Sequence, residues 1–177
     1  SKAANERFQK EIRKKLGLPP EEEKFALGGD DRDIPLDMSP SARKARAEAM
    51  GFDTGRVWYH GSVTTPDAFE AFDLGLSGRA MGDAYGQGVY LTPDRDRAAF
   101  WAEGSGHVRE LYVRVRNPYI WSDEDRFPNS ARRLTETLKA KGHDAIIVPS
   151  SIGQPRELVV FDPANLRDVN ASFDPSQ

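Results

Sequence analysis

Two positions at the ends of predicted strands carry side chains that could do chemistry. His60 closes the β-prone run 57–60, and Glu157 opens the apolar run 158–161. A carboxylate beside such a run is partly desolvated, and desolvated carboxylates are frequent at functional sites. Each position also has a structural interpretation, because a histidine at a strand end is often incidental and a glutamate there is often an edge charge.

Aromatic side chains provide the third candidate. Tyr90 follows the segment Gly86-Gln87-Gly88 and lies in a strand predicted for 89–91. Trp101 comes eleven residues later, in a helix that the sequence predicts from about 92 to 103. Aromatic residues in strands and helices most often fill the core, so this pair alone carries no functional inference.

The familiar catalytic and metal-binding templates are absent from the sequence. It has no Gly-Lys-Ser/Thr phosphate loop, no Gly-x-Ser-x-Gly elbow and no His-Glu-x-x-His. Gly86-Gln87-Gly88 resembles half of a dinucleotide fingerprint but precedes a strand, where the fingerprint follows one. Cysteine is missing, which excludes disulfides, cysteine-ligated zinc and thiol catalysis, and the three histidines have no metal-ligand spacing. We therefore expect chemistry without a metal.

Taken singly, His60, Tyr90 and Glu157 each have a structural interpretation, but together they indicate a function. In this order and with these flanks, they resemble the His-Tyr-Glu branch of the ADP-ribosyltransferase superfamily, which includes diphtheria-type toxins and poly(ADP-ribose) polymerases. The motifs Arg-Asn-Pro-Tyr and Gly-His-Asp-Ala-Ile-Ile lie between the second and third of them. The resemblance covers about 57–169. Residues 38–62 and the tail Phe-Asp-Pro-Ala-Asn-Leu-Arg at 161–167 are similar to bacterial and phage domains found in large polyvalent proteins and toxins.

The resemblance implies a role for each matching position, with NAD as the substrate. Glu157 would be the catalytic carboxylate, and His60 would hydrogen-bond the adenosine-side ribose. Tyr90 would stack on the nicotinamide ring. The other residues that would contact NAD are Gly61, whose backbone would hold the nicotinamide amide, Trp101, where the family usually has a second tyrosine, and Ser62 and Tyr85.

Such a set of side chains is suited to cleaving the bond between a ribose and a cationic pyridinium. Its transition state places positive charge on the sugar, as in glycoside hydrolysis. A fixed carboxylate stabilises that charge where it develops. Aromatic rings hold the cationic ring by stacking and cation–π attraction, worth about 0.5–2 kcal/mol per contact.

Departures from the family pattern bear on the group that accepts ADP-ribose. Trp101 keeps the stacking but lacks a phenolic hydroxyl, and Ala98 stands where polymerase relatives have a serine that contacts the nicotinamide amide. Pro155 stands where other relatives carry a glutamate or glutamine, and its side chain can neither activate nor bind an acceptor. Acceptor selection is therefore expected from the loop 149–156 or the glycine-rich loop 73–88.

We predict a mono-ADP-ribosyltransferase that cleaves NAD and transfers ADP-ribose to a protein or nucleic-acid acceptor. The bacterial and phage resemblance implies a toxin or effector domain that acts in the cytoplasm of a host or target cell, with an immunity or antitoxin protein as a further candidate partner. Two alternatives stay open: an NAD glycohydrolase with water as the acceptor, and a catalytically silent module that binds NAD, a nucleic acid or a partner. An unrelated nuclease is the least supported, because a suitable His/Lys/Arg constellation is lacking.

The elements that must position these residues indicate an α+β fold, since strands and helices do not alternate strictly. Helices are predicted over 40–50, 92–103 and 130–141, and strands over 57–60, 89–91, 111–116, 119–121, 145–148 and 158–161. Ala42, Ala45 and Ala49 predict a small-residue helix face that packs against a sheet. The resemblance implies an ADP-ribosyltransferase-like split β-sandwich with a few flanking helices and an N-terminal helical extension.

The first part of the chain differs from the rest. Residues 5–16 carry a narrow apolar stripe at helical spacing, and 17–37 read as a charged linker. We predict an N-terminal helix and linker over 1–37 and the catalytic domain over 38–177. The chain begins with Ser1 and has no apolar export segment, which fits a domain cut from a longer effector.

Composition sets further limits on the class of protein. The 177 residues are 38% hydrophobic and 30% charged, which excludes a wholly disordered chain. No run approaches the roughly 18 apolar residues of a membrane span, so no membrane partner is expected. The net charge of −3 weighs lightly against nucleic-acid binding, which needs clustered Lys and Arg.

Overall fold

The computed structural model describes residues 35–62, 84–103, 107–124, 126 and 129–176. The chain divides into two compact units, Ser1–Leu36 and Asp37–Gln177. The helix predicted over 5–16 lies outside the described residues, as do most of the linker 17–37 and of the loop 73–88. The assignment of an N-terminal extension and a catalytic domain stays a prediction.

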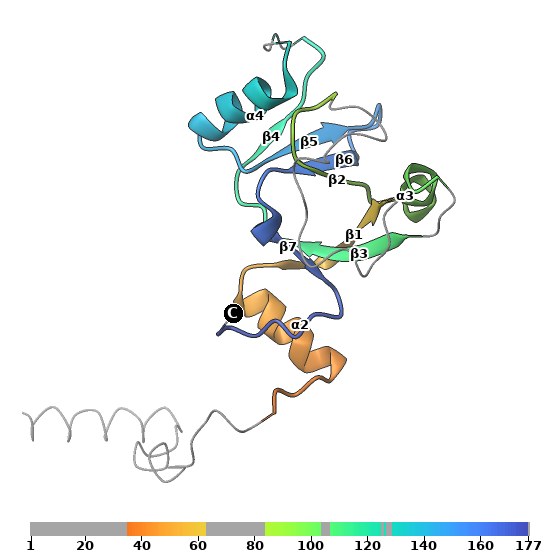
Figure 1. Cartoon of the computed structure of the whole chain (residues 1–177), viewed down its shortest axis with the longest axis vertical. Helices are drawn as coiled ribbons and strands as arrows, with labels where there is room; N and C mark the ends of the chain where they lie inside the picture. Colours follow the sequence, from red (N-terminus) through yellow and green to blue (C-terminus); the bar gives the residue numbers. More distant parts are fainter. Residues whose placement is uncertain (1–34, 63–83, 104–106, 125, 127–128, 177) are drawn as a thin grey trace, which may run out of the picture. The chain divides into compact units, whose positions relative to one another are not determined.

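Two β-sheets form the body of the second unit (Figure 1). The smaller sheet has the order β1-β3-β7, with antiparallel neighbours: β1 is Asp53–Gly61, β3 is Val108–Val113 and β7 is Leu166–Asp168. The larger sheet has the order β2-β6-β5-β4: β2 is Val89–Leu91, β6 is Pro155–Val160, β5 is Ala145–Pro149 and β4 is Pro118–Ile120. β4 and β5 run parallel, while β6 is antiparallel to both of its neighbours.

An apolar core lies between the two sheets. Side chains alternate between the two faces of a strand, so β2, β5 and β6 of the larger sheet send every second residue toward the smaller sheet. The buried residues that meet there are Val89, Leu91, Ala145, Leu158 and Val160 from the larger sheet and Trp58, Leu111, Val113 and Leu166 from the smaller one. The α+β class is therefore confirmed, with two sheets that share one core.

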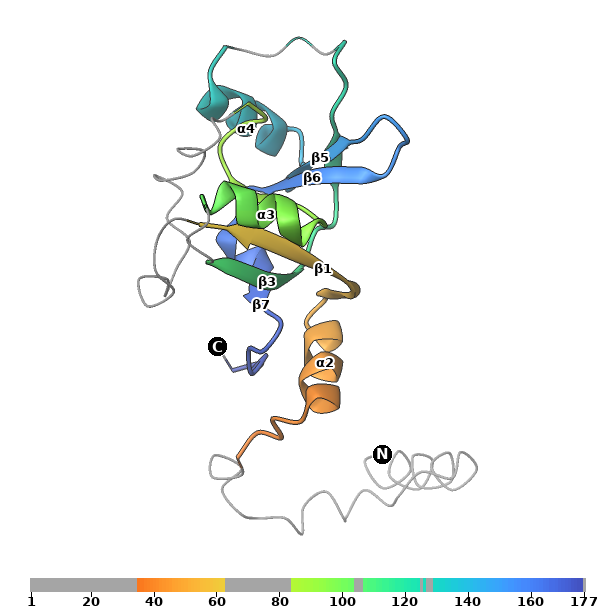
Figure 2. The same cartoon turned by 90° about the vertical axis from the view of Figure 1, so that its right-hand side faces the viewer.

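The described residues also form three α-helices: α2 is Pro40–Ala49, α3 is Arg95–Trp101 and α4 is Ala131–Ala140. Ser39 and Ser130 cap α2 and α4 through their side chains, as predicted. Gly51 and Gly142 follow these two helices with φ of 86° and 87°, a conformation that glycine adopts without strain. α4 covers the outer face of the larger sheet, and α3 lies beside β1 (Figures 1 and 2).

Four predictions about these elements were wrong. The strand predicted over 111–116 lies three residues earlier, as β3, because its pairing with β1 begins at Val108. α3 starts later than predicted, because Thr92 pairs with β1 in a β-bridge and Asp94 caps the helix instead. α2 buries Ala47 and not the predicted alanine face. Ala47 packs against Phe52, which directly precedes β1, and against Phe173 of the C-terminal segment. β7 has no counterpart among the predicted strands, since it spans only three residues after a short 3-10 turn.

Candidate functional site

The two sheets touch where β1 meets the end of β2. The backbone N–H of Tyr59 donates to the Thr92 carbonyl at 2.8 Å, and the N–H of Thr92 donates back to the Tyr59 carbonyl at 3.0 Å. Beside this bridge, Nδ1 of His60 lies 2.8 Å from the carbonyl oxygen of Tyr90. The bridge therefore brings together two of the predicted site residues from strands that are 30 positions apart.

The hydrogen bond to Tyr90 fixes the protonation pattern of His60. Burial lowers the pKa of the imidazole below its usual 6.5, and this effect outweighs the Tyr90 carbonyl, which raises it. The ring is therefore neutral at pH 7. Because a carbonyl oxygen can only accept, the single proton lies on Nδ1 and Nε2 carries the lone pair. In this state Nε2 can accept a hydrogen bond from a hydroxyl group.

Stability should fall as the pH drops through this histidine's range. The unfolded chain takes up a proton near pH 6.5 and the folded chain only at lower pH, so unfolding becomes easier in between. One proton limits the slope to about 1.4 kcal/mol per pH unit. His60→Asn keeps a donor for the Tyr90 carbonyl but removes the titrating ring. The free energy of unfolding should then change less with pH, as measured by urea unfolding between about pH 7.5 and about pH 5.

A second histidine provides the matched control for that measurement. Nδ1 of His143 also lies within hydrogen-bond distance of a carbonyl, that of Asn117, at 3.2 Å and at an exposed site. His143→Asn should leave the slope of the native protein in place. An unchanged slope in His60→Asn would show that another group is responsible.

Tyr90 and Glu157 lie on the same face of the larger sheet. Tyr90 pairs with Val159 across β2 and β6, and Glu157 is two residues before Val159 on β6. Residues two apart on a strand point to the same side. On this face, Tyr90 packs against the core beneath α4, and its hydroxyl donates to the Gly86 carbonyl at 2.6 Å.

Glu157 is a buried carboxylate held by two arginines. The residue is 6% exposed. Its Oε1 accepts from Nη2 of Arg97 at 2.6 Å and lies 3.5 Å from Nε of Arg156. Both contacts use Oε1, and within the described ranges no hydrogen bond reaches Oε2. The two guanidinium groups thus more than offset the charge of the carboxylate, and both act on the same one of its oxygens.

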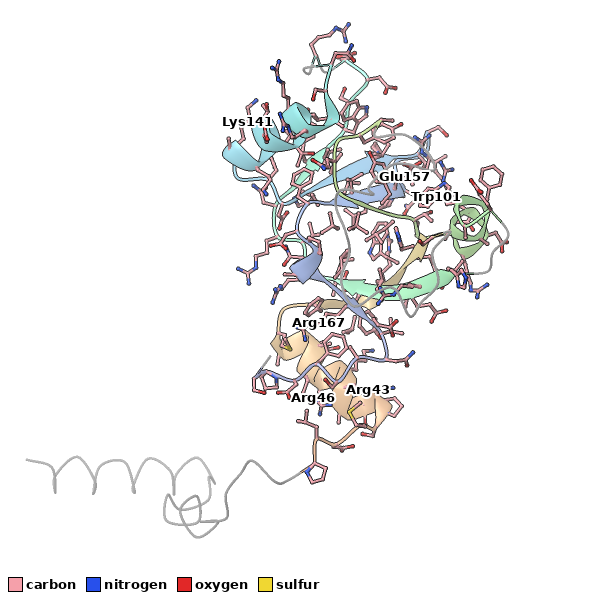
Figure 3. All side chains as sticks on the ribbon, viewed as in Figure 1. Arg43, Arg46, Trp101, Lys141, Glu157 and Arg167 are labelled. Carbon is pink, nitrogen blue, oxygen red and sulfur yellow. The ribbon has the colours of Figure 1, made fainter. Side chains whose placement is uncertain are left out.

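Trp101 is connected to Glu157 through Arg97. Both Arg97 and Trp101 belong to α3, four residues apart and therefore on one side of the helix. The Arg97 guanidinium carbon lies 5.6 Å from the centroid of the Trp101 ring. Glu157 and Trp101 lie in the same part of the unit (Figure 3). The tryptophan is 5% exposed, and its buried Nε1 has no hydrogen-bond partner among the described residues.

Gly61 and Ser62 occupy the end of β1. A Cβ atom added to Gly61 would lie 1.8 Å from the carbonyl oxygen of Ala98, so only glycine allows the strand to approach α3 this closely. The N–H of Ser62 donates to the His107 carbonyl at 3.0 Å, which holds the end of β1 against the start of β3. Gly61 is thus beside the helix of Arg97 and Trp101, whereas the described backbone contact of Ser62 is with the smaller sheet.

Tyr85 reaches the same site from the loop before β2. Its hydroxyl accepts from Nη2 of Arg156 at 2.8 Å, and its N–H donates to the Tyr90 hydroxyl at 3.1 Å. Its ring packs edge-on against Trp121, with centroids 5.1 Å apart. Tyr85 therefore links Tyr90 to the arginine beside Glu157.

Sequence reasoning missed the two arginines of this site. Arg97 has a visible signal, because it is four residues before Trp101 within a predicted helix. Arg156 has none, since a regular strand would point it away from the face of Glu157.

No protein-family model matches the chain, and no curated protein matches it. Within the described part of the chain, no group of three or more His, Asp or Glu side chains is arranged to hold a metal ion. None of the described helices has the length and apolar character needed to cross a membrane.

Proposed function

We propose that this chain is a mono-ADP-ribosyltransferase that uses NAD. One observation carries the proposal: His60, Tyr90 and Glu157, far apart in sequence, belong to strands that touch. His60 hydrogen-bonds the Tyr90 backbone, and Tyr90 shares a sheet face with Glu157. These are the positions that the resemblance to the His-Tyr-Glu branch marks for NAD cleavage. The paired sheets fit the split β-sandwich of that superfamily, which we propose as the fold.

Glu157 acts on the ribose at the bond to nicotinamide. Arg97 and Arg156 hold Oε1, so the carboxylate is fixed before the substrate binds. Oε2 then accepts a hydrogen bond from a ribose hydroxyl. As the bond to nicotinamide breaks, positive charge develops on the sugar, and the nearby carboxylate stabilises it. The electrons of the broken bond leave with nicotinamide, which becomes neutral.

The other residues orient the substrate. Nε2 of the neutral His60 accepts a hydrogen bond from the other ribose. Trp101 offers its ring to the pyridinium cation, a place that the Arg97 guanidinium takes in this structure. Because the ring is 5% exposed in this structure, Arg97 must leave it before nicotinamide can stack there. Tyr90 borders the same site from β2.

The proposal is tested by following both halves of NAD. NAD labelled in its adenosine half is incubated with the protein and a cell lysate, and nicotinamide release and macromolecular label are measured together. A transferase releases nicotinamide and labels a protein or nucleic acid. Equal amounts of nicotinamide and free ADP-ribose, with no labelled macromolecule, would identify a glycohydrolase. NAD binding by calorimetry without nicotinamide release would identify a silent binding module.

The setting of the activity belongs to the same proposal. The similarity of residues 38–62 to bacterial and phage domains supports an effector that acts in the cytoplasm of a host or target cell. Expression of the chain in bacteria should then slow growth, and the Glu157→Gln variant should not. Such toxicity would also justify a search for an immunity or antitoxin protein encoded nearby.

A further inference from the structure

Arg156 reaches the site because of a β-bulge next to Glu157. In the pairing of β5 with β6, Val148 faces Glu157, but the next residue, Pro149, faces Pro155. Arg156 is therefore an extra residue on β6 without a partner on β5. A bulge of this kind re-aims a side chain and is frequent beside functional sites. It explains how adjacent residues on one strand bring their side chains to the same point.

The arginine is held in place by its neighbours. Nη2 donates to the Tyr85 hydroxyl at 2.8 Å, while Nε lies 3.5 Å from Oε1 of Glu157. Nε itself has no hydrogen-bond partner within the described ranges. The side chain is 40% exposed, against 8% for Glu157, so Arg156 is open to the solvent while the carboxylate is buried. A molecule in the solvent can therefore contact Arg156 beside Glu157.

The charges of the site favour a ligand with one negative charge. Arg97 and Arg156 contribute two positive charges and Glu157 one negative charge, which leaves a net charge of +1. Guanidinium groups bind carboxylates through parallel, charge-assisted hydrogen bonds. A terminal phosphate carries about −1.5 to −2 at pH 7, and a chain with a net charge of −3 is poorly suited to a polyanion.

The transfer of ADP-ribose also favours an acceptor with one negative charge. A hydroxyl or amine acceptor must lose a proton as it attacks the ribose, and this needs a base. Pro155 offers no side chain for that task. Oε1 of Glu157 is engaged with arginine, and the proposed function assigns Oε2 to a ribose hydroxyl. A carboxylate is already an anionic nucleophile and needs no base.

Building on the proposed function, we infer that Arg156 binds the acceptor and that the acceptor is an Asp or Glu carboxylate of a protein. A carboxylate oxygen forms a bond to the ribose carbon while the bond from that carbon to nicotinamide breaks. The products are an ADP-ribosyl ester and neutral nicotinamide. No proton is taken up or released. Arg156 offsets the repulsion between the incoming carboxylate and Glu157.

The test compares transfer with hydrolysis in the full chain. The probes are synthetic peptides with a single Glu, Asp, Ser or Arg and a 5′-phosphorylated single-stranded oligonucleotide, each incubated with labelled NAD. We expect label on the Glu and Asp peptides, removed by neutral hydroxylamine, which cleaves such esters. In Arg156→Gln the ratio of transfer to hydrolysis should fall at least about tenfold. Arg156→Lys keeps the positive charge but loses the planar pair of guanidinium donors. It should recover part of the ratio of transfer to hydrolysis.

Arg132 supplies the matched control, because it lies on α4 with its side chain 75% exposed and pairs only loosely with Glu136, at 3.7 Å. Arg132→Gln should leave both rates unchanged. Label on the Ser or Arg peptide or on the oligonucleotide, or a native ratio in Arg156→Gln, would overturn the acceptor inference alone. Failure of the native protein to release nicotinamide would overturn the proposed function and this inference with it.

Discussion

Replacing Glu157 by glutamine should lower the rate of nicotinamide release by about 100- to 1,000-fold. Glutamine keeps the volume and an oxygen that can accept from Arg97, but it removes the negative charge that the proposed mechanism places beside the ribose. Loss of a single preorganised electrostatic group costs a factor of this order in other enzymes. The measurement is nicotinamide release from NAD at saturating substrate, with folding checked by thermal unfolding.

The variant should remain folded. Removing one partner of a buried ion pair is costly when the other charge stays buried. Here, however, the side chains of Arg97 and Arg156 are 37% and 40% exposed, so water can solvate them. Glu136→Gln is the matched control, since that carboxylate is 62% exposed on α4, and it should leave the rate unchanged. Release by Glu157→Gln at close to the native rate would remove this residue from the mechanism.

The sequence was sufficient to predict elements with local signals. Ser39 and Ser130 precede their helices, and Gly51 and Gly142 follow them, because capping and left-handed termination depend on neighbours in the chain. Predictions that depended on tertiary partners were less accurate. Thr92 looked like the start of a helix, but its backbone pairs with Tyr59, a residue more than 30 positions away.

The same distinction applies to the site. His60 and Glu157 could be selected because each borders a strand signal. Arg156 could not be selected, because the direction of its side chain depends on the bulge in the β5–β6 pairing, and a sequence pattern does not show the register of a hairpin. Arg97 is intermediate: its spacing from Trp101 predicts their contact on α3, but its bond to Glu157 depends on how the helix docks.

That docking depends on Gly61, so Gly61→Ala should be the most damaging small substitution in β1. The added Cβ would lie 1.8 Å from the Ala98 carbonyl oxygen, 2.8 Å from the Ala98 carbonyl carbon and 3.1 Å from the Ala102 nitrogen. These are backbone atoms of α3 and its C-terminal end, so the clash is relieved only by moving the helix or the strand. Overpacking of this kind costs about 3 kcal/mol, which corresponds to a drop in Tm of roughly 10 °C.

The site should suffer together with the stability. α3 carries Arg97 and Trp101, so a helix pushed away from β1 also draws the guanidinium away from Glu157. Gly55→Ala is the matched control in the same strand, because its Cβ would meet only the exposed side-chain oxygen of Asp53, at 3.1 Å, and that side chain can rotate. Thermal unfolding and nicotinamide release should both be impaired in Gly61→Ala and nearly native in Gly55→Ala. If Gly61→Ala unfolds at the native temperature, β1 and α3 do not approach each other as closely as this packing requires, and the placement of Arg97 beside Glu157 fails with it.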